Sequence, residues 1–257
     1  MGETVHQLTF ANTGCILRAA TATALCFAIA LDAQAPGLSS PSPVLAAAAT
    51  PADAPTPRRV GPIDISGYLD GYYSYNRNDP SEVANGKIDD LYNFNDKTNQ
   101  WNLSAAKLKL NQDLGIIGAH VDLIYGRTDK LMNTSSQLEF VEQAYISTKP
   151  PKAKGLELDF GKWVTSAGAE VIESKDNWNY SRSLLFAWAV PYYHLGARTS
   201  MPVSKTETAG LQVVNGWNNV TRSTGGATVG LTSALVEPKY MWNVNIYWRV
   251  PSSPSGL

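Results

Sequence analysis

Apolar and polar residues alternate with a period of two along most of the chain. The pattern is clearest where Leu156, Leu158 and Phe160 alternate with Glu157 and Asp159. Because successive side chains of a β-strand point to opposite faces, such a segment has one apolar and one polar face. The pattern predicts about nine strands, at 63–76, 99–111, 117–126, 139–149, 156–163, 192–202, 206–215, 229–235 and 240–249.

Two of these segments depart from strict alternation. In segment 99–111, Trp101 and Leu103 fall on the side that is otherwise polar, which predicts a β-bulge near the start of that strand. Segment 139–149 is strand-like in composition, but its period alone does not decide which residues face which side.

The connections between the predicted strands alternate in length. Long segments lie at 78–98, 129–138, 164–190 and 215–226, and short ones at 113–115, 150–154, 202–205 and 236–238. An up-and-down transmembrane barrel produces this alternation, with short turns on one side of the membrane and long loops on the other. A soluble sandwich with Greek-key crossings has no reason to produce it. The expected fold is an all-β, antiparallel, transmembrane up-and-down β-barrel.

The aromatic residues of the last predicted strand support a barrel. Tyr240 and Trp242 lie at one end of that strand and Trp248 at the other, as in two aromatic girdles around an apolar band.

The number of predicted strands, in contrast, indicates an incomplete barrel. About nine is an odd count, whereas single-chain bacterial barrels have even counts. We expect the sequence after Val250, residues 251–257, to be a flexible tail, and it contains no aromatic residue for a terminal strand. We therefore expect 63–250 to form part of a barrel.

The first 62 residues differ from the rest of the chain. Ala19–Leu31 is an apolar run preceded by Arg18, and it is shorter than the about 20 residues that a transmembrane helix needs. It predicts a cleaved signal peptide, 1–35, and hence export. Segment 36–62 holds nearly half of the chain's 15 prolines and is expected to be an extended, solvated linker.

Composition excludes several classes of function. Charged residues make up 17% of the chain, while 12 tyrosines and 7 tryptophans suit a membrane barrel. Loss of the signal segment removes both cysteines and leaves 20 basic and 20 acidic residues of the original 21 and 22. A neutral chain has no electrostatic footprint for nucleic acid. We expect no cofactor and no metal, because His120 and His194 would be two isolated ligands on distant strands.

Three neighbouring stretches carry a resemblance to a known family. DFGKWVTSAGAEVIES, NWNYSRSLLF and PYYHLGAR resemble the β-barrel porins of type 2, the OmpL-like outer-membrane proteins, with a likeness that extends over about 63–219. The resemblance implies a non-enzymatic pore in the outer membrane, in contact with lipid and with small hydrophilic solutes, and it leaves both monomer and homo-oligomer open. The many aromatic residues leave an alternative open, a secreted soluble β-domain that binds or hydrolyses carbohydrate.

Charged residues on the predicted polar faces carry both signs, which predicts passive diffusion with weak ion selectivity. They are Asp64, Asp70, Lys107, Lys109, Asp122, Asp159 and Arg198. Arg182, in the long segment 164–190, and Arg198 would form the basic side of a constriction. Alternatively, each arginine pairs with a neighbouring carboxylate.

Segment 164–190 also contains three carboxylates, Glu170, Glu173 and Asp176. Paired carboxylates could serve a glycosidase, but a solvated loop or the acidic side of a constriction is favoured. The segment has many apolar residues, and SRSLLFAWAV predicts a short helix with a serine at its start. We expect it to fold into the barrel, with its carboxylates facing Arg198 and His194. The competing hypothesis is that its apolar residues contact lipid or a neighbouring subunit.

Overall fold

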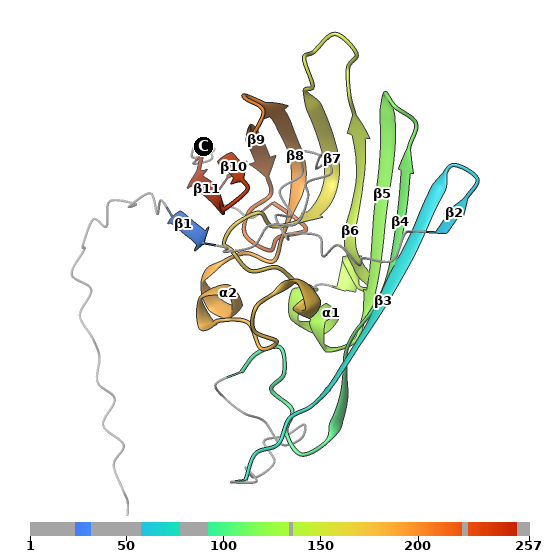
Figure 1. Cartoon of the computed structure of the whole chain (residues 1–257), viewed down its shortest axis with the longest axis vertical. Helices are drawn as coiled ribbons and strands as arrows, with labels where there is room; N and C mark the ends of the chain where they lie inside the picture. The colour runs from blue at the N-terminus through green and yellow to red at the C-terminus, as the bar shows by residue number, and fades with distance from the viewer. Residues whose placement is uncertain (1–23, 32–57, 78–91, 134–135, 223–225, 251–257) are drawn as a thin grey trace, which may run out of the picture.

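The computed structural model describes residues 24–31, 58–77, 92–133, 136–222 and 226–250. One eleven-stranded sheet dominates it (Figure 1). The strands are β1 Ala24–Leu31, β2 Arg58–Val60, β3 Ile63–Tyr73, β4 Trp101–Asp113, β5 Ile117–Tyr125, β6 Val141–Thr148, β7 Glu157–Val164, β8 Tyr193–Pro202, β9 Glu207–Val214, β10 Thr228–Glu237 and β11 Tyr240–Arg249. Helices α1 Arg127–Met132 and α2 Leu184–Ala189 and the 3₁₀ turns η1 Ser136–Leu138 and η2 Ser174–Asp176 lie in the long connections.

From β2 to β11, each strand pairs with its neighbours in the chain, and all pairs are antiparallel. The expected up-and-down topology is therefore confirmed. The strands also lie where the period-two pattern places them, with shifts of only a few residues at their ends. The long and short connections alternate as expected.

The structure has two strands more than the sequence pattern predicts. Strand β2 lies in the segment expected to be a linker, and it pairs with β3 through a turn at Gly61, which has a positive φ of 60°. The linker prediction fails at Arg58–Val60 because these three residues contain no proline and keep their backbone N–H donors.

The other additional strand, β1, lies in the segment expected to be the signal-peptide core. It pairs with β11 over Ala24↔Tyr247 to Leu31↔Tyr240. Cleavage of the signal peptide stays a prediction. The rest of the expected signal peptide, most of the linker and the 251–257 tail lie outside the described residues.

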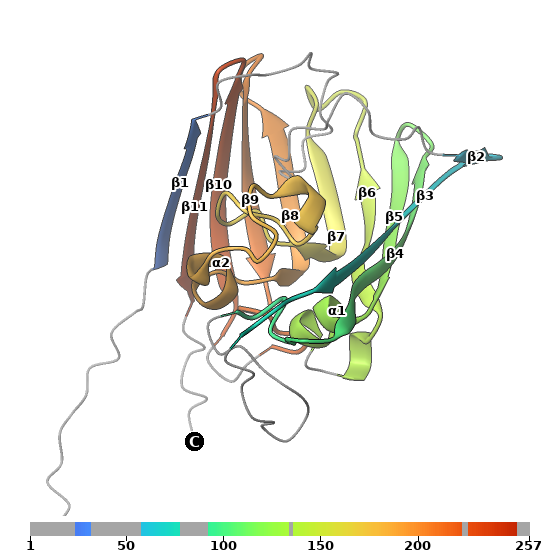
Figure 2. The same cartoon turned by 60° about the horizontal axis from the view of Figure 1, so that its bottom comes forward.

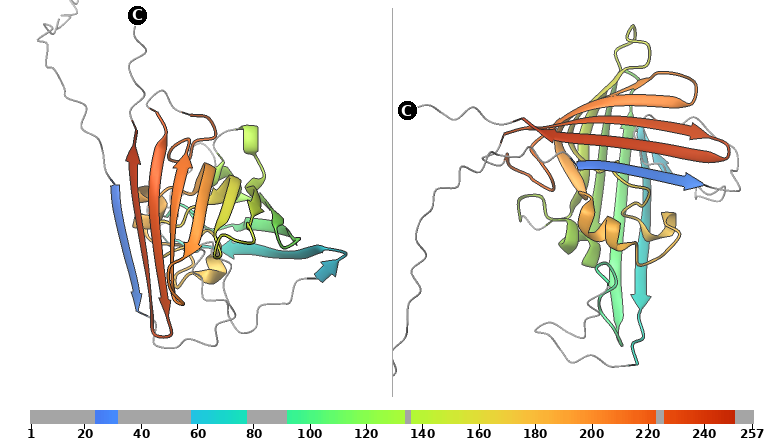
Figure 3. Two further views of the ribbon diagram at one scale, coloured as in Figure 1. Left: turned by 90° about the horizontal axis from the view of Figure 1, so that it is seen from above. Right: turned by 90° about the vertical axis from the view of Figure 1, so that its left-hand side faces the viewer.

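The sheet is strongly curved but not closed. In Figures 1 and 3, β1 and β11 lie at one end of the curve and β3 at the other. Among the described residues, no pairing joins β2 or β3 to β1 or β11. An incomplete barrel is what the sequence predicts. An unpaired strand edge is unfavourable in hydrocarbon because each free N–H or C=O costs several kcal/mol.

The sheet has a polar inner face and an apolar outer face, which is the reverse of the arrangement in a soluble protein. The inward-pointing side chains are polar and buried, and include Lys107, Asp122, Asp159, His194, Arg198, Gln212, Thr232, Asn243 and Asn245. The outward-pointing side chains are apolar and exposed, and include Leu69, Leu108, Leu123, Tyr125, Ile146, Phe160, Leu211, Val213, Leu231 and Trp242. A soluble sheet buries its apolar face, so this arrangement indicates a hydrocarbon environment outside the sheet.

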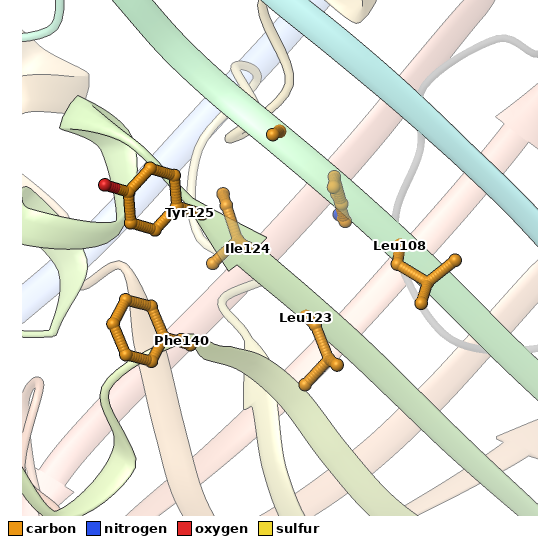
Figure 4. Close-up of a pocket in the computed structure, with 7 residues that line it drawn as sticks. Leu108, Leu123, Ile124, Tyr125 and Phe140 are labelled. Atoms are coloured by element: carbon orange, nitrogen blue, oxygen red, sulfur yellow. The ribbon is translucent and has the colours of Figure 1, made fainter.

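A shallow groove on the outward face illustrates this apolar surface. It has a volume of about 430 Å³ and includes Leu108 of β4 and Leu123 and Tyr125 of β5 (Figure 4). The rings of Tyr125 and Phe140 stack with their centroids 5.8 Å apart. The stack fixes two aromatic side chains at the end of β5 that leads into a long connection.

The apolar core lies in the long connections and not between layers of sheet. Phe94 from connection 74–100, Met132 of α1 and Phe186 of α2 belong to one buried cluster. Helix α2 confirms the helix expected near 181–190, and its N-cap is Ser183, whose Oγ accepts from Phe186 N. Helix α1 was not expected, since polar residues predicted only a loop at 129–138.

Two β-bulges change the facing of inner-wall residues. In β4, Asp70 pairs with Ala105 and Gly71 with Leu103, so the bulge expected near Trp101 and Leu103 is confirmed. In β6, Asp122 pairs with Gln143 and Leu123 with Val141, which leaves Glu142 as the extra residue. Glu142 is fully buried. This second bulge explains why the period of segment 139–149 was ambiguous.

Gly161 of β7 lies opposite Tyr145 of β6 and leaves room for it. Gly161 has a φ of 140°, and a Cβ on Gly161 would lie 2.2 Å from Ala144 O. We expect Gly161→Ala to lower the free energy of unfolding by about 2 kcal/mol or more, because it adds both backbone strain and overlap. Urea denaturation in detergent measures this. Gly115→Ala is the control, since Gly115 has a φ of 85° but open space around its Cβ. Equal losses would show that only backbone strain matters.

Candidate functional site

Connection 165–192 folds back over the concave face of the sheet (Figure 2). Its first anchor is on β11. Ser166 Oγ donates to Asn245 Oδ1 at 2.7 Å, and the side-chain amides of Asn243 and Asn245 both donate to Ser166 O. All three residues are buried. The expectation that this loop folds inward agrees with this geometry.

The second anchor lies on β3, near the other end of the sheet. Asp70 accepts hydrogen bonds from Ser174 Oγ at 2.8 Å and from Tyr180 Oη at 3.0 Å. Tyr68, on the same strand, donates its hydroxyl to Asp70 at 3.2 Å. The loop thus spans the space between the two ends of the curved sheet.

The third anchor is ionic and joins the loop to β4. Glu173 Oε1 accepts from Lys107 Nζ and, at 2.9 Å, from Lys109 Nζ. Both lysines point inward, since Leu108 between them is exposed on the outer face. Among the three carboxylates expected to line a constriction, Glu173 is the one that reaches the wall.

Lys107 is the centre of a buried charge cluster. Its ammonium group also contacts Asp122 of β5, at 3.2 Å, and Glu142 of β6. The side chain of Lys107 is only 1% exposed. Without its carboxylate partners, an ammonium group at this depth would be strongly destabilising. Each of its three partners comes from a different part of the chain.

The charge on Glu173 is stable over a wide pH range. Burial alone would raise the pKa of its carboxyl, but Lys107 and Lys109 outweigh burial and hold the pKa well below its usual value. A carboxylate with a depressed pKa stabilises the fold above its unfolded pKa, and this contribution is lost as the pH falls through the folded pKa. The ionic anchor is therefore intact at neutral pH.

Arg182 is buried inside the loop and does not face the wall. Its guanidinium donates to Tyr180 O at 2.9 Å and to Ile172 O, and lies 4.4 Å from the ring centroid of Phe94. Burial lowers the pKa of Arg182 from its usual value. Its φ of 58° is a strained conformation for a non-glycine residue. Arg182 thus stabilises the loop internally and is a poor candidate for the basic side of a constriction.

Arg198 pairs with its neighbour on the wall, as the alternative hypothesis predicted. Its Nε donates to Asp159 at 2.7 Å, and Ser147 Oγ donates to the same carboxylate at 2.6 Å. The guanidinium lies near the rings of Trp163 and Tyr145, 4.8 and 5.1 Å from their centroids. The Arg198 charge is thus paired with Asp159, and one ring from β7 and one from β6 lie against its guanidinium.

The expectation that the loop carboxylates face Arg198 and His194 is wrong. Glu170 accepts from Ser183 N at 2.8 Å, and so supports the start of α2. Asp176 pairs with the adjacent Lys175 at 2.6 Å.

His194 is 1% exposed and lies within 3.2 Å of Thr165 Oγ1, with its ring stacked on Tyr247. Each loop carboxylate thus has a nearer partner, which lies within the loop for Glu170 and Asp176 and on β4 for Glu173.

The apolar residues of the loop are divided between core and surface. Ile172 and Phe186 are buried, and Val171 and Tyr180 are partly buried. The remaining residues are exposed: Trp178 at 84%, Trp188 at 72%, Leu185 at 65% and Leu184 at 59%. Folding of the loop into the curve of the sheet therefore buries only part of its apolar side chains. The four exposed side chains agree with the competing hypothesis, in which this part of the loop contacts lipid or a neighbouring subunit.

Several important residues were missed by sequence reasoning. Asn243 and Asn245 lie on a polar face, but asparagine there gave no hint of a partner in the loop. Glu142 is hidden by the bulge in β6. Lys162 was not considered, yet it is 2% exposed and donates to Asn133 Oδ1 and Val141 O, at 2.5 Å each.

The described residues contain no group of three or more histidine, cysteine, aspartate or glutamate side chains that could hold a metal ion. Within the same residues, no helix is long and apolar enough to cross a membrane.

The chain matches the family model described as putative beta-barrel porin-2, OmpL-like, over residues 62–252. The chain belongs to this family. The match covers every strand from β3 to β11, and it extends beyond the 63–219 stretch that carried the resemblance in the sequence. No curated protein and no solved structure has a significant match to the chain.

We expect Glu173→Gln to loosen the loop of this porin-family chain by about 2 kcal/mol, since a neutral amide cannot replace the bond to two ammonium groups. Hydrogen exchange of amides in 165–192 should become roughly thirtyfold faster at pH 7. Asp176→Asn is the matched control, because Asp176 contacts only Lys175 among the described charges. Equal effects of both substitutions would contradict the anchoring role.

The depressed pKa of Glu173 leads to a separate prediction for the unmodified protein. Exchange protection of 165–192 should be unchanged from pH 7 to about pH 4.5, and should decline only at lower pH, below the usual glutamate pKa of about 4.3. Exchange rates corrected for the intrinsic pH dependence measure this. A loss of protection between pH 7 and 5 would contradict the assignment of Glu173 as the anchor.

Proposed function

We propose that the protein is an outer-membrane porin, exported through a cleaved signal peptide, and that it allows passive diffusion of small hydrophilic solutes. Membership of a porin family supports a role in transport across the outer membrane and argues against a role as an enzyme. The observation that carries the proposal is the polarity of the sheet, with buried charges on the concave face and exposed apolar residues on the convex face.

The inner wall supports weak selectivity between ions. Its charges are of both signs and are paired locally, as Arg198 is with Asp159 and Lys107 with Asp122. A wall with paired charges presents little net field to a passing ion, in contrast to a ring of one sign. Hydrated solutes of either charge would therefore pass.

Connection 165–192 is the proposed constriction. It is fixed to β3, β4 and β11 by the three anchors and lies within the curve of the sheet, where it reduces the space open to solutes. Its contribution is steric and partly acidic, through Glu173. The basic side is supplied by Lys107 and Lys109 on β4.

A secreted soluble carbohydrate-binding domain is less well supported. Such a domain would bury an apolar face, whereas residues such as Leu69 and Phe160 are 75% and 70% exposed on the outer face. The carboxylates that could have served a glycosidase are engaged with Ser183, two lysines and Lys175.

Fractionation and conductance test the proposal. The protein should be recovered from outer membranes only with detergent, migrate differently on gels before and after heating, and form pores with weak ion preference in planar bilayers. Recovery in the soluble periplasm or in the medium, with no change on heating, would contradict it.

Removal of the constriction should enlarge the pore. We expect deletion of residues 170–180, which removes the contacts of Glu173, Ser174 and Tyr180, to raise single-channel conductance and shift ion preference towards anions, since acidic groups are lost. Bilayer recordings with KCl gradients measure both effects. If conductance is unchanged and only the folding yield falls, the loop is a structural or subunit contact.

A further inference from the structure

A polar furrow lies on the inner wall beside the anchors of the loop. It has a volume of about 300 Å³ and extends from Val164, where the loop begins, to Lys149 and Glu157 near the short turn between β6 and β7. The side chains that line it come mainly from four adjacent strands, and include Lys109, Asn111, Asp113, His120, Gln143, Tyr145 and Ser147. Its size is at the lower end of the range for small-molecule sites.

One wall of the furrow is held in place by stacked rings. The rings of Tyr145 and His120 are nearly parallel, with their centroids 4.9 Å apart, and Arg198 lies 5.1 Å from the Tyr145 centroid. Gly161 provides the space behind Tyr145. The furrow is therefore a built feature of the wall, because its shape is fixed by residues on β5, β6, β7 and β8.

A buried acceptor in the furrow has an unused hydrogen-bonding position. Glu157 is only 4% exposed, and its Oε2 atom has no hydrogen-bond partner in the described structure. A carboxylate oxygen at this depth requires a donor, from water or from a solute. The nearest cation, Lys149, is 3.9 Å from the other oxygen, Oε1, and 3.2 Å from Asp113.

The charges in the furrow favour a neutral solute. Lys109 is engaged by Glu173, and Lys149 lies between Asp113 and Glu157. Its two ammonium groups and two carboxylates balance, so the furrow offers no net charge to an ion. Gln143 donates to Asp122 and accepts from Val164 N, and Ser147 donates to Asp159, so the remaining polar groups are the amides of Asn111 and Gln112. Each amide provides both a donor and an acceptor, as a polyhydroxylated molecule requires.

We propose that this furrow is a weak transit site for neutral polyhydroxylated solutes of monosaccharide size. The inference rests on the proposed porin function and adds a preferred class of solute to it. A hydroxyl of the solute donates to Glu157 Oε2, and others exchange water for the amides of Asn111 and Gln112. The furrow is open along one side, so binding is weak and the solute leaves easily, as conduction requires.

Binding can be tested without any transport measurement. Saturation-transfer NMR on the detergent-solubilised protein, with D-glucose as the probe, should show binding that Glu157→Gln weakens by about tenfold or more, since a bond to a charged acceptor is lost. Asn111→Leu provides a second variant, because Asn111 is exposed and its replacement leaves the fold intact. Glu207→Gln, on β9 and outside the furrow, is the matched control and should bind glucose as the unmodified protein does.

Glycine and inorganic phosphate are probes of the competing chemistries. Saturation transfer to glycine, or broadening of the ³¹P signal of phosphate by the protein, without saturation transfer to glucose would overturn the proposal in favour of an ion site. Glucose binding that is equal in all four proteins would also overturn it, because the furrow would not be the site.

Conductance of the same samples separates this inference from the proposed function. Pores that conduct KCl while glucose binding is absent leave the porin function standing and remove only the transit site. Absence of both pores and binding would contradict the porin function itself. Pores whose current is partly blocked by glucose, with the block lost in Glu157→Gln and kept in Glu207→Gln, would support both.

Discussion

The buried ammonium group of Lys107 is the interaction on which the inner wall depends. A charge that is removed from water needs partners at close range, and Lys107 finds them in Asp122, Glu142 and Glu173. These carboxylates belong to β5, to the bulge of β6 and to the inward loop. Neutralising one charge therefore fixes the register of two strands and the position of the loop together. The outer face has no such requirement, because its apolar residues need only hydrocarbon around them.

The fold was predictable because period-two alternation is a local signal. Leu108 between Lys107 and Lys109, or Leu158 between Glu157 and Asp159, is enough to define both faces of a strand. Alternating loop lengths then define the topology. The first two strands were missed for opposite reasons: β2 is too short to show a period, and the uniformly apolar Ala24–Leu31 has none.

The sequence was enough to predict which residues belong to the candidate site, but not which of them contact one another. Glu173, Lys107 and Lys109 were recognised as inward-facing charges, yet Glu173 is 66 residues away from Lys107 in the chain. Nothing local specifies such a contact, since it depends on the curvature of the sheet and on where the loop crosses it. Arg198 and Asp159, in contrast, lie opposite each other on adjacent strands, and strand register alone brings them together. The local pairing hypothesis therefore held for Arg198, and the longer-range one failed for Glu170 and Asp176.

The anchors of the inward loop also determine the order of assembly. Tyr180 and Asp70 are 110 residues apart, and Ser166 and Asn245 are 79 residues apart in the opposite direction along the chain. The loop can reach its final position only after β11 has joined the sheet. Contacts between distant parts of a chain form slowly, because closing long loops costs entropy. Until then, Ile172 and Phe186 remain accessible to wrong partners. Damage to the last strand would therefore leave the loop unseated, even in a chain whose earlier strands had formed correctly.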